Sequence, residues 1–221
     1  MRRELLVWFR LKHRTIVPLL GTAMIESPFP ALVSKWMPSG TLYVYLEEAT
    51  ILTASAKVGL ASPLLIPIMI KNLHSENVVH GDLHPANVLI DCSGNPRLID
   101  FGLATVVGDA ELQLSITTAS RSLDPRWRAP EVIGIDPDLD PERPNFMSDI
   151  YSFGGIMFFV ISGERPWKKK QPHHIYVELS NKANPARPDN ILDNHWDLIQ
   201  KCWSWNPKDR PRVIEVFECI Y

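Results

Sequence analysis

The segment Met147–Gly163, "MSDIYSFGGIMFFVISG", constrains the fold more than any other part of the chain. It is apolar around nearly its whole circumference, and a helix of that kind is stable only when other elements bury it. Ser148 is the predicted N-cap of this helix and Gly163 its predicted end. We therefore expect a mainly helical unit with this segment at its centre.

Composition and charge limit the class of protein. The 221 residues are 45% hydrophobic and 22% charged, the balance of a globular domain. A net charge of −2 gives no electrostatic reason to expect a nucleic-acid or membrane partner. The longest uncharged runs, Val58–Ile70 and Ile150–Gly163, are shorter than the roughly 20 residues that a membrane-spanning helix needs. Three cysteines without metal-ligand spacing favour a reducing, cytoplasmic location.

The residues before the central helix have a mixed pattern. Arg3–Lys12 predicts a helix, and residues 15–25 and 31–37 are β-like. Asn87–Ile90 and Arg97–Ile99 predict two short strands joined by a tight turn. One face of the first predicted helix holds Leu5, Trp8, Phe9 and Lys12.

Residues 61–74, "ASPLLIPIMIKNLH", have a helical pattern interrupted by Pro63 and Pro67. An interior proline costs a helix roughly 3 kcal/mol. Either the helix is kinked, or the stretch results from a frame or splice error in the conceptual translation of the gene. The sequence leaves both alternatives open. Residues 194–203 and 211–221 predict two further amphipathic helices, whereas His173, His174 and Lys168–Lys170 are predicted to be solvated loop residues.

Two motifs carry residue types suited to moving a phosphate: "HGDLHPANVLID" at residues 80–91 and "IDFG" at residues 99–102. A carboxylate on a rigid loop, Asp82, can orient a hydroxyl and accept its proton. Asn87 and Asp100 offer the hard oxygen ligands that Mg²⁺ prefers. The structural alternative is that Asp82 and Asn87 form turns and that Asp100 caps a strand.

With "RWRAPEV" (126–132), the central helix and "KCWSWNPKDRP" (201–211), these motifs resemble a eukaryotic protein kinase domain. "LVSKWMPSGTL" (32–42) and "RWRAPE" resemble the tyrosine-kinase-like, Raf-like group of serine/threonine kinases. The resemblance implies an α+β fold, with a truncated small β-rich lobe and hinge in residues 1–37. A complete, mainly helical large lobe would occupy residues 38–221. It also implies ATP, Mg²⁺ and a protein substrate; the oligomeric state is open.

The resemblance assigns roles residue by residue. Asp82 is the catalytic carboxylate, and His84 stands where a lysine usually meets the γ-phosphate. Asn87 and Asp100 are the expected Mg²⁺ ligands, and Glu4 is expected to pair with the nucleotide-binding lysine. The expected ATP contacts are Glu4, Ser34, Lys35, Met37, Asn87 and Leu89. The expected structural or regulatory residues are His80, Phe101, Gly102, Asp124, Glu131, Asp149 and Arg210.

Two packing features are also implied. Trp8, Leu19, His80 and Phe101 would stack as an apolar spine anchored by Asp149. Because most of the small-lobe sheet that covers the first helix has no counterpart in the sequence, apolar surface is expected to stay exposed there. The residues expected in that patch are Leu5, Leu6, Trp8 and Phe9.

The sequence departs from the family pattern in three places. No G-x-G-x-x-G loop or strand lysine precedes Glu4, so the phosphate cradle is missing from these residues. Gly81 replaces the arginine that usually pairs with a phosphorylated activation loop, whose candidate hydroxyls here are Thr117, Thr118, Ser120 and Ser122. Asp124 occupies a position usually held by Ser or Thr, and we expect it to pair with His84.

Three functions remain open. The first is a Ser/Thr protein kinase whose activity is weak in this chain because the cradle is missing. The second is a truncated, pseudokinase-type binding or scaffold module. The third is a small-molecule phosphotransferase of the aminoglycoside or choline type, which "HGDLHPANVLIDCSG" also resembles; "RWRAPEV" and "CWSWNPKDRP" have no counterpart there.

Overall fold

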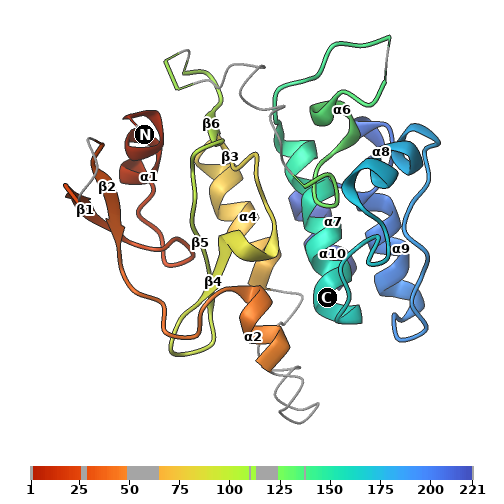
Figure 1. Ribbon diagram of the computed structural model, residues 1–221, viewed down its shortest axis with the longest axis horizontal. Helices are drawn as coiled ribbons and strands as arrows, with labels where there is room; N and C mark the ends of the chain where they lie inside the picture. Colours follow the sequence, from red (N-terminus) through yellow and green to blue (C-terminus); the bar gives the residue numbers. More distant parts are fainter. Residues whose placement is uncertain are drawn as a thin grey trace.

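The structure is a computed structural model that describes residues 2–25, 29–48, 65–109, 111–112, 124–136 and 138–220. An N-terminal part with few strands adjoins a helical C-terminal part (Figure 1). This mixed α/β arrangement is consistent with the expected fold. The lobe boundary placed between residues 37 and 38 stays a prediction. Pro63 and the four candidate activation-loop hydroxyls lie outside the described residues.

The N-terminal part consists of helix α1 (Arg2–Arg10) and an antiparallel pair, β1 (Leu19–Ala23) and β2 (Ala31–Ser34). The inward face of α1 differs from the predicted one, since Val7 and Trp8 are buried while Phe9 is 64% exposed. Trp8 turns inward because its indole Nε1 donates a hydrogen bond of 2.8 Å to the Val17 carbonyl. The predicted exposed patch therefore reduces to Leu6 and Phe9, with Leu5 half-buried.

Short strands and helices form the middle and C-terminal parts. Strand β3 pairs with β6, and β4 pairs with β5, both antiparallel. The elements are α2 (Leu42–Glu48), α4 (Leu65–Ser75), β3 (Val78–Val79), η1 (Pro85–Asn87), β4 (Val88–Ile90), β5 (Pro96–Leu98), β6 (Thr105–Val106), α6 (Pro130–Ile133), α7 (Phe146–Ser162), α8 (Pro172–Ser180), α9 (Asp193–Cys202), η2 (Pro207–Asp209) and α10 (Val213–Ile220). Among the described residues, no helix is long and apolar enough to cross a membrane.

Pro67 lies in helix α4, whose described part is Leu65–Ser75, and its side chain is buried. Residues 49–64, which precede this part, lie outside the described residues. A kinked helix and a frame or splice error therefore both stay predictions for this stretch.

Helix α7 is buried along twelve of its residues, as its composition predicts. Its N-cap is Asn145 and not the predicted Ser148: the Asn145 side chain accepts from the N–H groups of Met147 and Ser148. Ser148 is the third helical residue, and its hydroxyl accepts from the Asn145 N–H to complete a capping box. Gly163 ends the helix with φ 73°, as expected.

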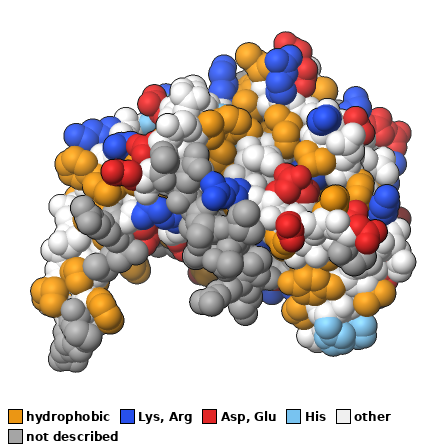
Figure 2. All heavy atoms as spheres, turned by 90° about the horizontal axis from the view of Figure 1, so that it is seen from above, with side chains coloured by type: hydrophobic (Ala, Val, Ile, Leu, Met, Phe, Trp, Pro, Cys, Tyr) orange, Lys and Arg blue, Asp and Glu red, His pale blue; other side chains and the backbone are white. Residues whose placement is uncertain are grey.

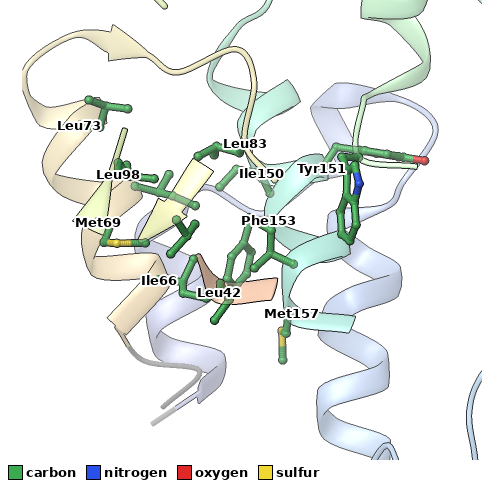
Figure 3. Close-up of a cluster of buried hydrophobic side chains, with 14 of the residues drawn as sticks. Leu42, Ile66, Met69, Leu73, Leu83, Leu98, Ile150, Tyr151, Phe153 and Met157 are labelled. Atoms are coloured by element: carbon green, nitrogen blue, oxygen red, sulfur yellow. The ribbon is translucent and has the colours of Figure 1, made fainter. Parts of the chain in front are cut away.

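The core lies between α7 and α4. Figure 3 shows Ile66, Met69 and Leu73 of α4 in one cluster with Ile150 and Phe153 of α7. This packing supplies the burial that α7 needs. Residues His173 and His174, which the sequence places in a loop, lie on helix α8, although both are exposed as predicted.

A buried carboxylate connects α7 to the segment that follows β3. Asp149, 1% exposed, accepts hydrogen bonds from the backbone N–H groups of His80 (2.9 Å) and Gly81 (3.0 Å). Its Oδ2 also lies 2.9 Å from Nε2 of His74 in α4. Three separate parts of the chain therefore meet at one side chain.

Replacing Asp149 by alanine should destabilise the fold strongly. We expect Asp149→Ala to lower the free energy of unfolding by about 2 to 5 kcal/mol, because a buried donor left without an acceptor costs about 1 to 3 kcal/mol. Asp149→Asn keeps one acceptor oxygen and should lose less. Urea denaturation measures both. The exposed Asp140→Ala is the control; an equal loss there would contradict this role of Asp149.

Candidate active site

The loop at residues 80–87 joins β3 to β4, and its first two backbone N–H groups donate hydrogen bonds to Asp149. Gly81 adopts φ 76°, in the left-handed region that disfavours side chains. A Cβ there would lie 2.7 Å from the Leu103 carbonyl oxygen and 3.1 Å from Cβ of Pro144. A residue with a side chain, such as arginine, therefore does not fit this backbone at position 81.

Asp82 lies in a mostly buried, charge-compensated position. Its Oδ1 accepts from Arg128 Nη2 at 3.1 Å, and its Oδ2 lies 3.7 Å from His84 Nε2. The Asp82 side chain is 13% exposed and that of Arg128 only 4%. Burial alone would raise the pKa of Asp82, but His84 and the charge of Arg128 outweigh it and lower the pKa below its usual value. The carboxylate is therefore kept ionised.

Asn87 connects the Asp82 loop to the strand that leads to Asp100. Its amide nitrogen donates to the Asp82 carbonyl at 3.0 Å, and its own carbonyl accepts from the Ile99 N–H at 3.1 Å. The amide oxygen of Asn87 is the atom that would ligate a metal. The structure thus brings Asn87 beside Asp82, as the predicted roles require.

Asp100 is exposed and has φ 62°, which is uncommon for a residue with a side chain. Its Oδ1 accepts from the Gly102 N–H at 3.1 Å, which closes the "DFG" turn. Such strained backbone concentrates at functional sites. The carboxylate of Asp100 and the amide oxygen of Asn87 are oxygen donors of the kind that Mg²⁺ takes, so the donor set fits the predicted metal.

Aromatic packing joins this turn to the N-terminal part. Phe101 is fully buried, with its ring centroid 5.3 Å from that of His80 and 5.8 Å from that of Trp8. Leu19 is partly buried against the same core. Burial lowers the pKa of His80, whose ring nitrogen lies 3.1 Å from the Ile99 carbonyl. The predicted spine residues thus pack in one core, and the backbone N–H of His80 in this group donates to Asp149.

Glu4 on α1 lies beside Asp100. Burial, reinforced by the negative charge of Asp100, raises the pKa of Glu4. Arg3, next to it, instead donates to the carbonyls of Gly102 and Ala104. The nucleotide-binding lysine that Glu4 is expected to pair with has no counterpart in these residues, so this pairing stays a prediction.

The predicted adenine contacts follow β2. Ser34 ends this strand opposite Leu19, and the Lys35 N–H donates to the Pro18 carbonyl at 3.0 Å. Met37 is buried, and Leu89 on β4 is half-buried. Lys35 and Met37 lie on the connection that leads from β2 to α2, whereas Leu89 lies on β4.

The predicted pair of His84 and Asp124 is wrong. Both side chains line one cavity of about 270 Å³ with Asp82, yet Asp124 binds Arg126, with Nη1 at 2.9 and 3.0 Å from its two oxygens. Arg126 is two residues away and presents a guanidinium that carboxylates prefer. His84 instead lies against Asp82.

Glu131 and Arg210 form a buried, two-pronged ion pair. Arg210 Nη1 and Nη2 lie 2.6 and 2.8 Å from the two carboxylate oxygens of Glu131. The Arg210 side chain is fully buried and also donates to the carbonyls of Met147 and Ser204. The pair ties α6 to the start of α7 and to η2, which fits the structural roles expected for both residues.

Arg126 and Arg128, the arginines of "RWRAPE", contact candidate site residues although neither is among the predicted ones. Two arginines within one candidate motif are a usable signal in the sequence. The partner of Arg128 lies 46 residues away, so only the folded chain brings the two together.

Comparison with known proteins decides the family. The profile of the family described as protein tyrosine and serine/threonine kinase matches residues 1–220. The chain belongs to this kinase family. Similar kinases include the serine/threonine-protein kinase/receptor R831 of Acanthamoeba polyphaga mimivirus, 31% identical over 98% of this chain and 13% of that protein. The transforming protein Abl of Abelson murine leukemia virus is 28% identical over 99% of the chain and 28% of its own length. Serine/threonine-protein kinase STY46 of Arabidopsis thaliana is 27% identical over 98% of the chain and 36% of its length.

These relatives include both serine/threonine and tyrosine kinases. The family is therefore that of the protein kinases, and it does not fix the acceptor hydroxyl. The chain spans only 13 to 36% of the lengths of these three kinases.

Adding a side chain at Gly81 should distort the loop at residues 80–87. We expect Gly81→Ala to lower the free energy of unfolding by about 2 to 4 kcal/mol, because backbone strain and a core clash combine. Gly163→Ala is a matched control: its φ is also positive, at 73°, but nothing lies within 4 Å of the added Cβ. Chemical denaturation should show a clearly larger loss at Gly81; equal losses would exclude the clash.

Removing Arg128 should change the titration of Asp82. A carboxylate whose folded pKa is lowered stabilises the fold above its unfolded pKa, and that contribution is lost as pH falls through the folded pKa. Arg128→Met should raise the pKa of Asp82, so the loss begins at higher pH. Carboxyl NMR titration and unfolding measured against pH test this. Arg126→Met is the control, since Arg126 binds Asp124; an unchanged Asp82 pKa in Arg128→Met would contradict the ion pair.

Proposed function

We propose that this site transfers the γ-phosphate of ATP to serine or threonine hydroxyls of a protein. The observation that carries the proposal is the Asp82 carboxylate, kept ionised between Arg128 and His84 at the edge of a cavity. A general base must be ionised and within reach of the hydroxyl proton. The Ser/Thr preference rests on the likeness of "LVSKWMPSGTL" and "RWRAPE" to that group of kinases.

The two carboxylate oxygens of Asp82 have different contacts and therefore different roles. Arg128 occupies Oδ1 and fixes the plane of the carboxylate. Oδ2 faces His84 at 3.7 Å and is the oxygen that accepts the proton of the substrate hydroxyl. His84, 23% exposed and at the same cavity, is placed to contact the phosphate side of the reaction.

Asn87 and Asp100 would hold Mg²⁺ through their side-chain oxygens. When bound, this ion neutralises charge on the phosphates during transfer. The role of the protein is to orient these donors: Asn87 through its hydrogen bond to Asp82, and Asp100 through the turn closed by Gly102.

The 221-residue polypeptide tested on its own is expected to transfer phosphate slowly. Electrostatic stabilisation of the transferred group is usually the largest catalytic contribution. These residues contain no G-x-G-x-x-G sequence, and Glu4 lies beside Asp100 in place of a lysine. The alternative is a truncated, pseudokinase-type binding or scaffold module. A cytoplasmic location is part of the proposal and rests on the three free cysteines.

Replacing Asp82 by asparagine tests the proposal. Radiolabelled Mg²⁺-ATP and peptides matched except for Ser, Thr or Tyr would measure transfer. We expect slow Mg²⁺-dependent labelling of Ser and Thr peptides, reduced about 10²- to 10⁴-fold in Asp82→Asn. Asp140→Asn, on the exposed loop before α7, is the control. Labelling that Asp82→Asn leaves unchanged would refute this site, and no labelling at all would favour the binding module.

A further inference from the structure

A large cationic cleft lies at the end of the helical part, between the connections that join α8 to its neighbours. One connection, residues 163–171, follows α7, and the other, residues 181–192, leads to α9 at the right of Figure 1. Five basic side chains line the cleft, which we define by them: Arg165, Lys168, Lys169, Lys170 and Arg187. We propose that this cationic cleft binds an acidic segment of the protein substrate. The proposal rests on the proposed function and names its substrate class.

The first support is charge. Only two carboxylates, Glu164 and Asp189, line the cleft beside its five basic residues, although the chain as a whole carries a net charge of −2. The cleft encloses about 730 Å³, within the size range of sites that bind ligands. Positive charge concentrated in a concave surface raises the local concentration of negatively charged partners.

The second support is that the positive charge is available. Lys168 pairs with Glu164 at 2.9 Å, but both side chains are about half exposed, and such pairs are weak. Arg187 pairs with Asp193, which is 89% exposed, and Lys170 pairs with Glu178, whose side chain is 30% exposed. Among the described residues, no carboxylate pairs with Arg165 or Lys169. An incoming carboxylate can therefore bind Arg165, Lys168 and Lys169 without breaking a strong ion pair.

The third support is the position of the cleft beside the active site. Arg165 lines both the cationic cleft and the cavity that holds Asp82 and His84. Its guanidinium carbon lies 4.7 Å from the ring centroid of Tyr43, another wall of the Asp82 cavity. Arg126 also spans the two: it binds Asp124 at the cavity and donates to the Lys170 carbonyl at the cleft.

A polypeptide whose hydroxyl reaches Asp82 can thus extend directly into the cationic cleft. Aspartate or glutamate residues near the acceptor serine or threonine would contact Lys169 and Lys168, with Arg165 at the junction. The shared wall favours a segment of the substrate over a nucleic acid or a lipid surface, because neither of those needs continuity with Asp82.

The test measures binding, and therefore does not depend on transfer. Fluorescence anisotropy would compare a labelled serine peptide flanked by glutamates with the same peptide carrying glutamines. We expect about tenfold tighter binding of the glutamate peptide at low salt, with the advantage falling as salt increases. In the double variant Lys168→Gln/Lys169→Gln that advantage should fall to about twofold or less.

The matched control is Lys201→Gln/Lys208→Gln, which removes the same charge from exposed positions outside the cleft. Retention of the glutamate preference in this control supports the proposal. Equal binding of the two peptides, or an equal loss in both double variants, would overturn it. So would tighter, Lys169-dependent binding of a single-stranded oligonucleotide or of vesicles containing phosphatidylserine.

The outcome separates this proposal from the proposed function. Transfer that depends on Asp82 but shows no glutamate preference would leave the kinase site standing and reject the acidic substrate. Glutamate-dependent binding through Lys168 and Lys169 without Asp82-dependent transfer would support the cleft and reject the catalytic role.

Discussion

The buried carboxylate of Asp149 is the interaction on which the arrangement of the active site depends. A charge removed from water is costly unless hydrogen bonds compensate it. Here the compensation comes from the backbone N–H groups of His80 and Gly81 and from the His74 ring. Since α7 can exist only as a buried helix, Asp149 has a fixed place in the core. The loop at residues 80–87 is therefore positioned by the helical core and not by its own local turns.

Ion pairs between distant segments complete the site. Arg128 reaches Asp82 across 46 residues, and Arg210 reaches Glu131 across 79. In both pairs the guanidinium is almost fully buried, so loss of either partner would leave an uncompensated charge. These two ion pairs fix the segment that contains Arg128 and Glu131. The first pair joins it to the loop at residues 80–87, and the second joins it to the start of α7.

The N-terminal part is joined to this core by aromatic packing and by backbone hydrogen bonds. Trp8 contacts Phe101, which contacts His80. The Val17 N–H donates to the Leu98 carbonyl, and the Leu98 N–H donates to the Thr15 carbonyl. On the outside, hydrophobic side chains gather at the end of the molecule formed by α1, β1 and β2 (Figure 2), including Phe9 and Leu20. Trp36, 83% exposed, follows β2 in the chain. Helix α1 therefore packs against the rest of the protein on one face only, and the opposite face, which includes Phe9, is exposed.

Short-range patterns in the chain were sufficient to predict the elements that carry a clear apolar pattern. The all-round apolar run predicts α7, the short β-branched runs predict β4 and β5, and the order of motifs indicates the kinase family. The tertiary structure alone decided which partner each polar side chain takes. Asp124 binds Arg126 and not His84, Asn145 caps α7 in place of Ser148, and Trp8 points inward. The reason is physical: periodicity reports which residues prefer burial, whereas the choice among possible ion-pair or capping partners depends on the backbone conformation and the neighbouring segments, which only the folded chain fixes.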